Sequence, residues 1–138
     1  MRILFLGTNR ELGLFRVEVL ENEGFQVLFP RSKSDALSAI EEGGFELVLV
    51  SYSLPSDTAQ ELVELARQKN PRCTIISISE TGWDDPKIQP DASILAESGP
   101  RGMLEAIRNA RDKRLRRIKK PRLSVILLQR LDVGFECL

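Results

Sequence analysis

Short apolar runs alternate along this chain with longer amphipathic stretches. Short continuous apolar runs that end at glycine, proline or serine are typical of strands buried on both faces of a parallel sheet. The strongest of these runs, Phe45–Val50, ends at Ser51. We therefore expect five strands, at Ile3–Leu6, Phe25–Phe29, Phe45–Val50, Thr74–Ser79 and Ala92–Ala96.

The stretches between these runs carry the spacing and the end signals of helices. Four apolar residues recur at helical spacing after the first run and are expected to form the buried face of the first helix: Leu12, Phe15, Val19 and Leu20. The expected N-caps are Thr8 with Glu11 reaching back, Ser32 or Ser34, and Asp57 with Gln60, and a last helix is expected at Met103–Arg117.

Strands that alternate with helices predict a parallel sheet with helices on both faces. The twelve-residue connection Glu80–Asp91 contains Gly82, Pro86 and Pro90, so we expect a loop or a single helical turn there. The expected architecture is an α/β, flavodoxin-like, doubly wound sheet of five parallel strands. Its fourth helix is short or absent, and an extended basic helix and tail follow the last strand. Ligands in such sheets bind at the carboxyl ends of the strands.

Composition narrows the chemistry that these strand ends can carry. The chain has 138 residues and no histidine, which excludes Ser-His-Asp and Cys-His catalysis and histidine-ligated zinc. Its two cysteines, Cys73 and Cys137, make no disulfide framework and are expected to be free thiols. No apolar run is long enough to span a membrane. We therefore expect a cytoplasmic protein.

The balance of 20 basic and 20 acidic residues hides a division along the chain. Residues 1–110 hold 11 basic and 17 acidic residues, whereas residues 111–138 hold 9 basic and 3 acidic residues. We expect one domain at 1–113, and a basic helix extension with an apolar tail at 114–138. That tail alternates with a period of two near its end, which leaves three options open: a strand at the sheet edge, a self-association segment, or an unordered end.

The run Phe45-Glu-Leu-Val-Leu-Val-Ser-Tyr-Ser-Leu-Pro55, with its acidic-apolar strand and Leu-Pro loop, resembles the receiver domain of bacterial response regulators. The segments Glu21–Val27 and Ala106–Ala110 resemble the family's exit into strand two and its last helix. The resemblance covers residues 1–113 and implies the CheY-like form of the flavodoxin-like sheet.

The same resemblance implies a degenerate phospho-acceptor pocket. Gly7 and Thr8 stand where receivers carry the acidic pair that holds magnesium, and Ser51 stands at the phosphorylated aspartate. Ser79 matches the family's Ser/Thr, and Glu97 replaces its lysine. The aromatic switch position is Ile94. We therefore expect a pseudo-receiver that lacks the phospho-acceptor aspartate, with no cofactor and no bound magnesium.

The resemblance implies a signalling role in a two-component phosphorelay. The pocket residues predict that this role is independent of phosphorylation and works through protein–protein contacts. The chain is not expected to be an enzyme. Its expected partner is a protein such as a histidine kinase or an output protein, with self-association as a further option. Two alternatives stay open: a flavin or nucleotide sensor or enzyme at the strand ends, and non-specific nucleic-acid binding through the basic tail. The candidate contact residues are Trp83, Arg114, Arg116, Arg117, Lys119 and Lys120.

Overall fold

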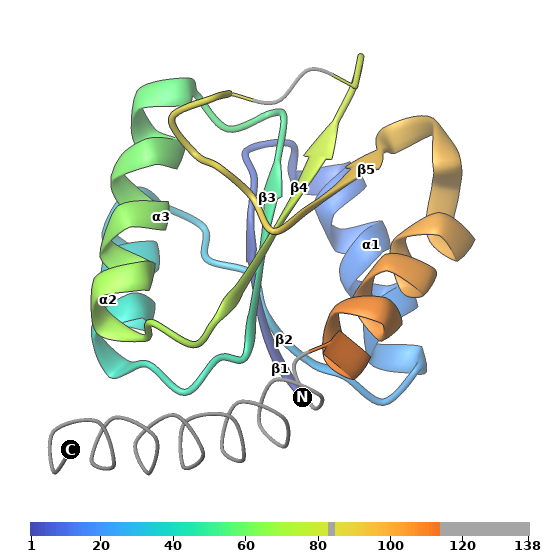
Figure 1. Cartoon of the computed structure of the whole chain (residues 1–138), viewed down its shortest axis with the longest axis horizontal. Coiled ribbons are helices and arrows are strands. Elements are labelled where there is room, and N and C mark those ends of the chain that lie inside the picture. Colours follow the sequence, from blue (N-terminus) through green and yellow to red (C-terminus); the bar gives the residue numbers. More distant parts are fainter. Residues whose placement is uncertain (83–84, 114–138) are drawn as a thin grey trace, which may run out of the picture. The chain divides into compact units, whose positions relative to one another are not determined.

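Five parallel strands form one sheet in the order β2-β1-β3-β4-β5 (Figure 1). Their register places Leu4 opposite Val48, and Leu49 opposite Ile76. All five expected strands are confirmed, each within two residues of its expected bounds: β1 (Arg2–Leu6), β2 (Gln26–Leu28), β3 (Leu47–Ser51), β4 (Thr74–Ser79) and β5 (Ala92–Leu95). This is the doubly wound, flavodoxin-like order that the sequence predicts.

The computed structural model describes residues 1–82 and 85–113. The chain forms two units, residues 1–106 and 107–138, and the first of them contains the whole sheet. Of the second unit, residues 107–113 are described, and they are helical. None of the described helices is long and apolar enough to cross a membrane.

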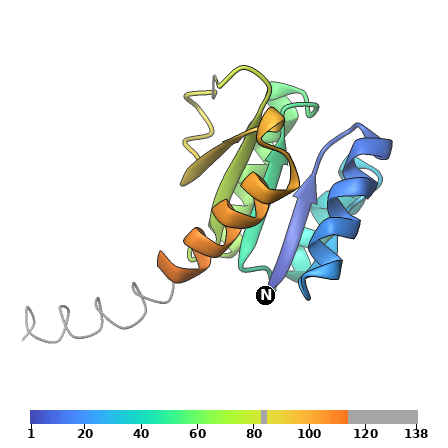
Figure 2. The same cartoon turned by 90° about the vertical axis from the view of Figure 1, so that its right-hand side faces the viewer.

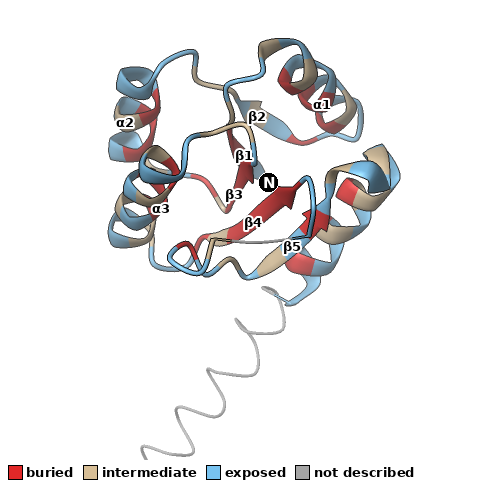
Figure 3. Cartoon of the chain, turned by 90° about the horizontal axis from the view of Figure 1, so that it is seen from above, coloured by how far each residue is buried: buried red, intermediate tan, exposed pale blue. Residues whose placement is uncertain are grey.

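Helices cover both faces of the sheet in residues 1–106. The face that carries α2 (Lys33–Glu42) and α3 (Ser56–Lys69) lies opposite the face that carries α1 (Arg10–Asn22) (Figure 1). The helical residues 99–106, which follow the short 3-10 turn η1 (Ala96–Ser98), lie on the same face as α1 (Figure 2). Because both faces are covered, β1, β3 and β4 are almost entirely buried (Figure 3).

Two of the three expected N-caps are wrong. The first helix is capped by Asn9, whose side chain accepts a hydrogen bond from the Leu12 backbone N–H, and not by Thr8. The third helix begins after Pro55 without a side-chain cap, and Asp57 lies in its first turn. Ser32 caps the second helix as expected.

The buried face of α1 also differs from the expected one. Phe15 is 52% exposed, while Arg16 and Val17 are buried. The reason is tertiary: Gly13 lies directly against the ring of Phe29, where a Cβ atom would overlap the ring. This contact turns the Gly13 side of the helix toward the sheet and leaves Phe15 outside.

The connection from β4 to β5 contains turns and bends and no helix in its described residues, 80–82 and 85–91. This agrees with a fourth helix that is short or absent. The Asp85 carboxylate holds this connection to α3 by accepting hydrogen bonds from Ser56 Oγ and, at 2.9 Å, from Gln60 Nε2. The last helix begins at residue 99 rather than at Met103, directly after η1.

Candidate functional site

The ends of β1 and β3 approach each other closely at the carboxyl edge of the sheet. A Cβ atom placed on Gly7 would lie 3.0 Å from Ser51 Cβ and 3.2 Å from Ser53 Oγ. That spacing is tighter than ordinary van der Waals contact, so a larger residue at position 7 would have to displace one of these serines. Glycine therefore permits the close approach of the two strand ends.

Hydroxyl groups fill the space between these strand ends. Ser53 Oγ donates to Ser51 Oγ at 3.2 Å and accepts a hydrogen bond from the Thr8 backbone N–H at 3.0 Å. In return, Thr8 Oγ1 donates to the Ser53 carbonyl oxygen at 2.6 Å. Ser51 is 4% exposed. We call Thr8, Ser51 and Ser53 the hydroxyl network.

Three of the expected pocket residues, Gly7, Thr8 and Ser51, are thus brought together. Sequence reasoning missed Ser53, which joins them. The available signal was the repeated serine in Ser51-Tyr52-Ser53, because residues two apart at a strand exit can point the same way.

The other expected pocket residues lie at the ends of β4 and β5. Ser79 is buried and accepts a hydrogen bond from the Gly82 backbone N–H at 2.8 Å. Ile94 is buried in β5, and Glu97 is exposed in η1. Glu97 therefore offers a carboxylate at the surface.

The hydroxyl network offers neutral oxygens and backbone groups. Magnesium in proteins is normally held by one or two carboxylates in an octahedral oxygen shell. Across residues 1–82 and 85–113, no group of three or more His, Cys, Asp or Glu side chains is placed to hold a metal ion. Ser51 can act as a hydrogen-bond donor and acceptor, but a serine nucleophile needs an adjacent base to activate it.

Sequence reasoning also missed a buried charge that interacts with Tyr52. Arg16 of α1 is only 9% exposed, although it carries a guanidinium. Burial lowers the pKa of Arg16, and Tyr52 offsets part of that effect through electrostatic attraction and a side-chain hydrogen bond. The pattern of hydrophobic residues does not predict a buried arginine. The only signal was a basic side chain between Phe15 and Val17 in a helix that must bury one face.

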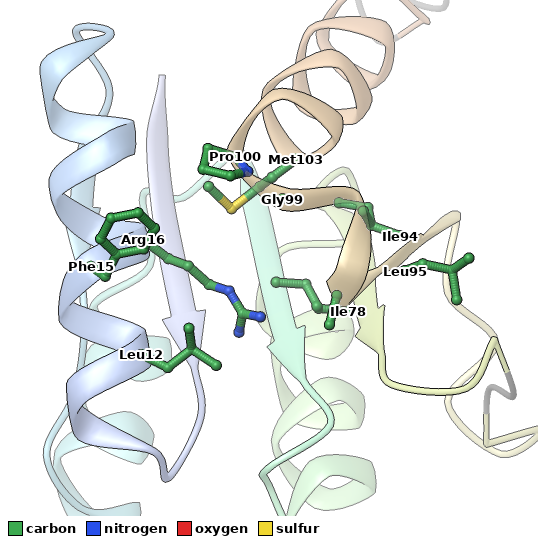
Figure 4. Close-up of a pocket in the computed structure, with 10 residues that line it drawn as sticks. Leu12, Phe15, Arg16, Ile78, Ile94, Leu95, Gly99, Pro100 and Met103 are labelled. Atoms are coloured by element: carbon green, nitrogen blue, oxygen red, sulfur yellow. The ribbon is translucent and has the colours of Figure 1, made fainter.

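Arg16 points into a groove of about 80 Å³ between α1 and the segment that runs from β5 into the last helix (Figure 4). The other side chains that line the groove are mainly apolar. They include Ile78 of β4, the expected switch residue Ile94, and Met103. The groove therefore combines an apolar wall with one cationic group.

Replacing Arg16 by methionine is expected to raise the free energy of unfolding by about 1 kcal/mol. A buried charge costs desolvation energy that only a well-placed counter-ion repays, and apolar residues of similar volume are often more stable in such positions. Tyr52 is half-exposed and can bond to water instead.

Urea denaturation followed by circular dichroism measures the change in the free energy of unfolding. Arg72→Met, at an exposed position, is the control and should change stability by less than about 0.5 kcal/mol. A loss of stability in Arg16→Met would show that the guanidinium is a net stabiliser.

A larger cleft, of about 290 Å³, opens at the carboxyl ends of β1 and β3 and is lined by Arg10, Arg31 and Lys33. Two of these cations already have partners within the fold. Arg10 stacks over the Phe29 ring, 4.3 Å from its centroid, and Lys33 pairs with Glu61 at 2.5 Å. The positions of Arg10 and Lys33 are thus explained by contacts within the fold. The flavin or nucleotide alternative stays a prediction.

The remaining candidate contact residues lie outside the described part of the chain. They are Trp83, Arg114, Arg116, Arg117, Lys119 and Lys120. The alternative of nucleic-acid binding through the basic tail, and the three options for the segment after Pro121, therefore stay predictions.

Solved structures of response-regulator receiver domains are similar to this chain in fold. A CheY-like receiver domain from Methanospirillum hungatei JF-1 has a TM-score of 0.71 and 26% identity, over 83% of this chain and 96% of that one. The response regulator TrrA from Thermotoga maritima, solved in complex with Mg²⁺-BeF, has a TM-score of 0.68 and 19% identity, over 79% of this chain and 97% of that one.

The signal receiver domain of an HD domain-containing protein from Pseudomonas fluorescens Pf-5 has a TM-score of 0.70 and 17% identity, over 82% of this chain and 95% of that one. No family model and no curated protein matches the sequence. The chain therefore has the CheY-like receiver fold.

Proposed function

We propose that this chain is a receiver-fold signalling domain that is not phosphorylated on an aspartate and works through constitutive protein–protein contacts. The observation that carries the proposal is the hydroxyl network, in which Ser51 stands where receivers carry their phospho-acceptor. Its setting is a two-component phosphorelay, and its partners are a histidine kinase or an output protein. No chemical step on a substrate belongs to this role.

The charges at the strand ends support the loss of phosphorylation. A phosphoryl group arriving at Ser51 would need a divalent cation to neutralise its charge, but Ser51 is bonded to the hydroxyl of Ser53 and lies beside Gly7, which has no side chain. Glu97 replaces the lysine that would pair with the phosphoryl oxygens. Two like charges about 4 Å apart repel by several kcal/mol at intermediate dielectric. The missing carboxylates around Ser51 and the negative charge of Glu97 thus both disfavour phosphorylation.

The surface of α1 supports a role in protein contacts. Leu14 and Phe15 are adjacent on this helix, and both are about half exposed, at 50% and 52%. Exposed aromatic and aliphatic side chains of this size lose solvent contact favourably when a partner covers them. They therefore suit an interaction surface that needs no phosphorylation to form.

Addition of magnesium and beryllofluoride is expected to leave the protein unchanged. The physical reason is the lack of carboxylates around Ser51, so the ion and the phosphoryl analogue have no shared ligand set. Two-dimensional NMR of the ¹⁵N-labelled full chain measures the response at Ser51, Tyr52 and Ser79. TrrA from Thermotoga maritima, which was solved with Mg²⁺-BeF bound, is the positive control. Saturable, magnesium-dependent shifts at Ser51 would refute the proposal.

A further inference from the structure

We propose that the groove between α1 and the start of the last helix is a binding site for a small carboxylate, with the Arg16 guanidinium as its counter-ion. The site is separate from the hydroxyl network, and the inference goes beyond the signalling role proposed above. The ligand class is a short organic acid with an apolar body.

The first argument is the unpaired charge. Arg16 is more than nine-tenths buried, yet none of the described residues forms an ion pair with it. Within residues 1–82 and 85–113, its polar partner is the neutral hydroxyl of Tyr52. A guanidinium carries five N–H donors and stays protonated, so a single phenol leaves most of its hydrogen-bonding capacity unused. Buried charges in proteins are normally paired, and an anion from outside would complete this one.

The second argument is the shape and polarity of the groove. Figure 4 shows the guanidinium directed from α1 toward Ile78, with Ile94 and Met103 on the opposite wall. Among the described residues that line the groove, none carries a carboxylate. A ligand with a negative head and an apolar body would therefore meet complementary groups at both ends.

The third argument is size, which excludes the larger anions. A volume of about 80 Å³ is well below the roughly 300–1,000 Å³ of pockets that hold drug-sized ligands. A flavin or a nucleotide does not fit into it. The planar fork of arginine pairs with a carboxylate through two parallel hydrogen bonds, and the apolar wall favours an organic acid over an inorganic anion such as phosphate.

Titration of the full chain with propionate and butyrate, followed by NMR at the Arg16 side chain and the Ile94 methyl groups, tests the proposal. Propionamide and butyramide have the same shapes without the charge and serve as ligand controls. We expect saturable binding of at least one acid, with a dissociation constant of about 1 mM or tighter, and no saturable binding of the amides.

Two variants locate the site. Arg16→Met removes the charge and is expected to be stably folded, and it should weaken binding at least about tenfold. Ala96→Leu keeps Arg16 but adds apolar atoms to a residue that lines the groove, and it should weaken binding as well. Arg72→Met, which removes an exposed charge, should bind as the native chain does.

The proposal is overturned if the amides bind as well as the acids, or if either groove variant keeps the native affinity. It is also overturned if neither acid binds the native chain saturably. In that last case an acidic side chain of a partner protein would be the remaining counter-ion for Arg16. Binding of the acids says nothing about magnesium at Ser51, so this test and the beryllofluoride test succeed or fail independently.

Discussion

Replacement of Ser51 by aspartate is expected to lower the free energy of unfolding by roughly 3 kcal/mol near pH 7, without restoring phosphorylation. Ser51 is almost fully buried, so the new carboxylate would lose its hydration. Ser53 offers it two hydrogen-bond donors, its backbone N–H and its hydroxyl, which offset only part of that loss. Gly7, Thr8 and Glu97 would still provide neither a metal ligand set nor a cation.

The new carboxyl group makes the stability of the Ser51→Asp variant depend on pH. Burial raises the pKa of a carboxyl group above its unfolded value of about 3.9. Stability therefore falls as the pH rises from about 4 through the folded-state pKa, since the folded protein binds the proton more tightly than the unfolded chain. Below about pH 4 both states are protonated, and the charge-dependent loss disappears.

Urea denaturation of Ser51→Asp near pH 7 and near pH 4 measures this difference. Ser51→Asn has the same shape without the charge, and its smaller loss should not depend on pH. Incubation with magnesium and acetyl phosphate, followed by intact mass spectrometry, tests phosphorylation. Uptake of a phosphoryl group by Ser51→Asp would show that magnesium can bind without the acidic pair.

Replacement of Leu49 by alanine is expected to destabilise the fold by about 2–5 kcal/mol. Leu49 lies in β3, the middle strand of the sheet, and it is fully buried. Its register partners are Phe5 of β1 and Ile76 of β4, which are also buried. Rigid neighbours on both sides cannot close the cavity, and the loss is a large fraction of the 5–15 kcal/mol that typically separates folded from unfolded proteins.

Leu14→Ala is the matched control, because Leu14 is half-exposed on α1 and alanine is an excellent helix former. Its stability should change by less than about 0.5 kcal/mol. Urea denaturation with an unchanged dependence on denaturant would show that both variants unfold as the native chain does. Equal losses in the two variants would contradict a core centred on β3.

Some of the residues at the strand ends could be identified from the sequence and others could not. The resemblance to receivers placed Gly7, Thr8 and Ser51 at one site, and the structure brings these three together. Ser53 was missed because its contribution is a set of hydrogen bonds to Thr8, which is 45 positions away in the chain. Arg16 was missed because its burial depends on how α1 is rotated.

The sequence by itself determined the strands and their parallel arrangement. These features follow from local patterns, because a run such as Leu47–Ser51 is apolar on both sides wherever it packs. The tertiary structure alone decided which side of α1 faces the sheet. There the ring of Phe29 lies against Gly13, and a contact between residues so far apart leaves no trace in the spacing of apolar residues along one helix. Arg16, three positions further along α1, lies on this same buried side of the helix.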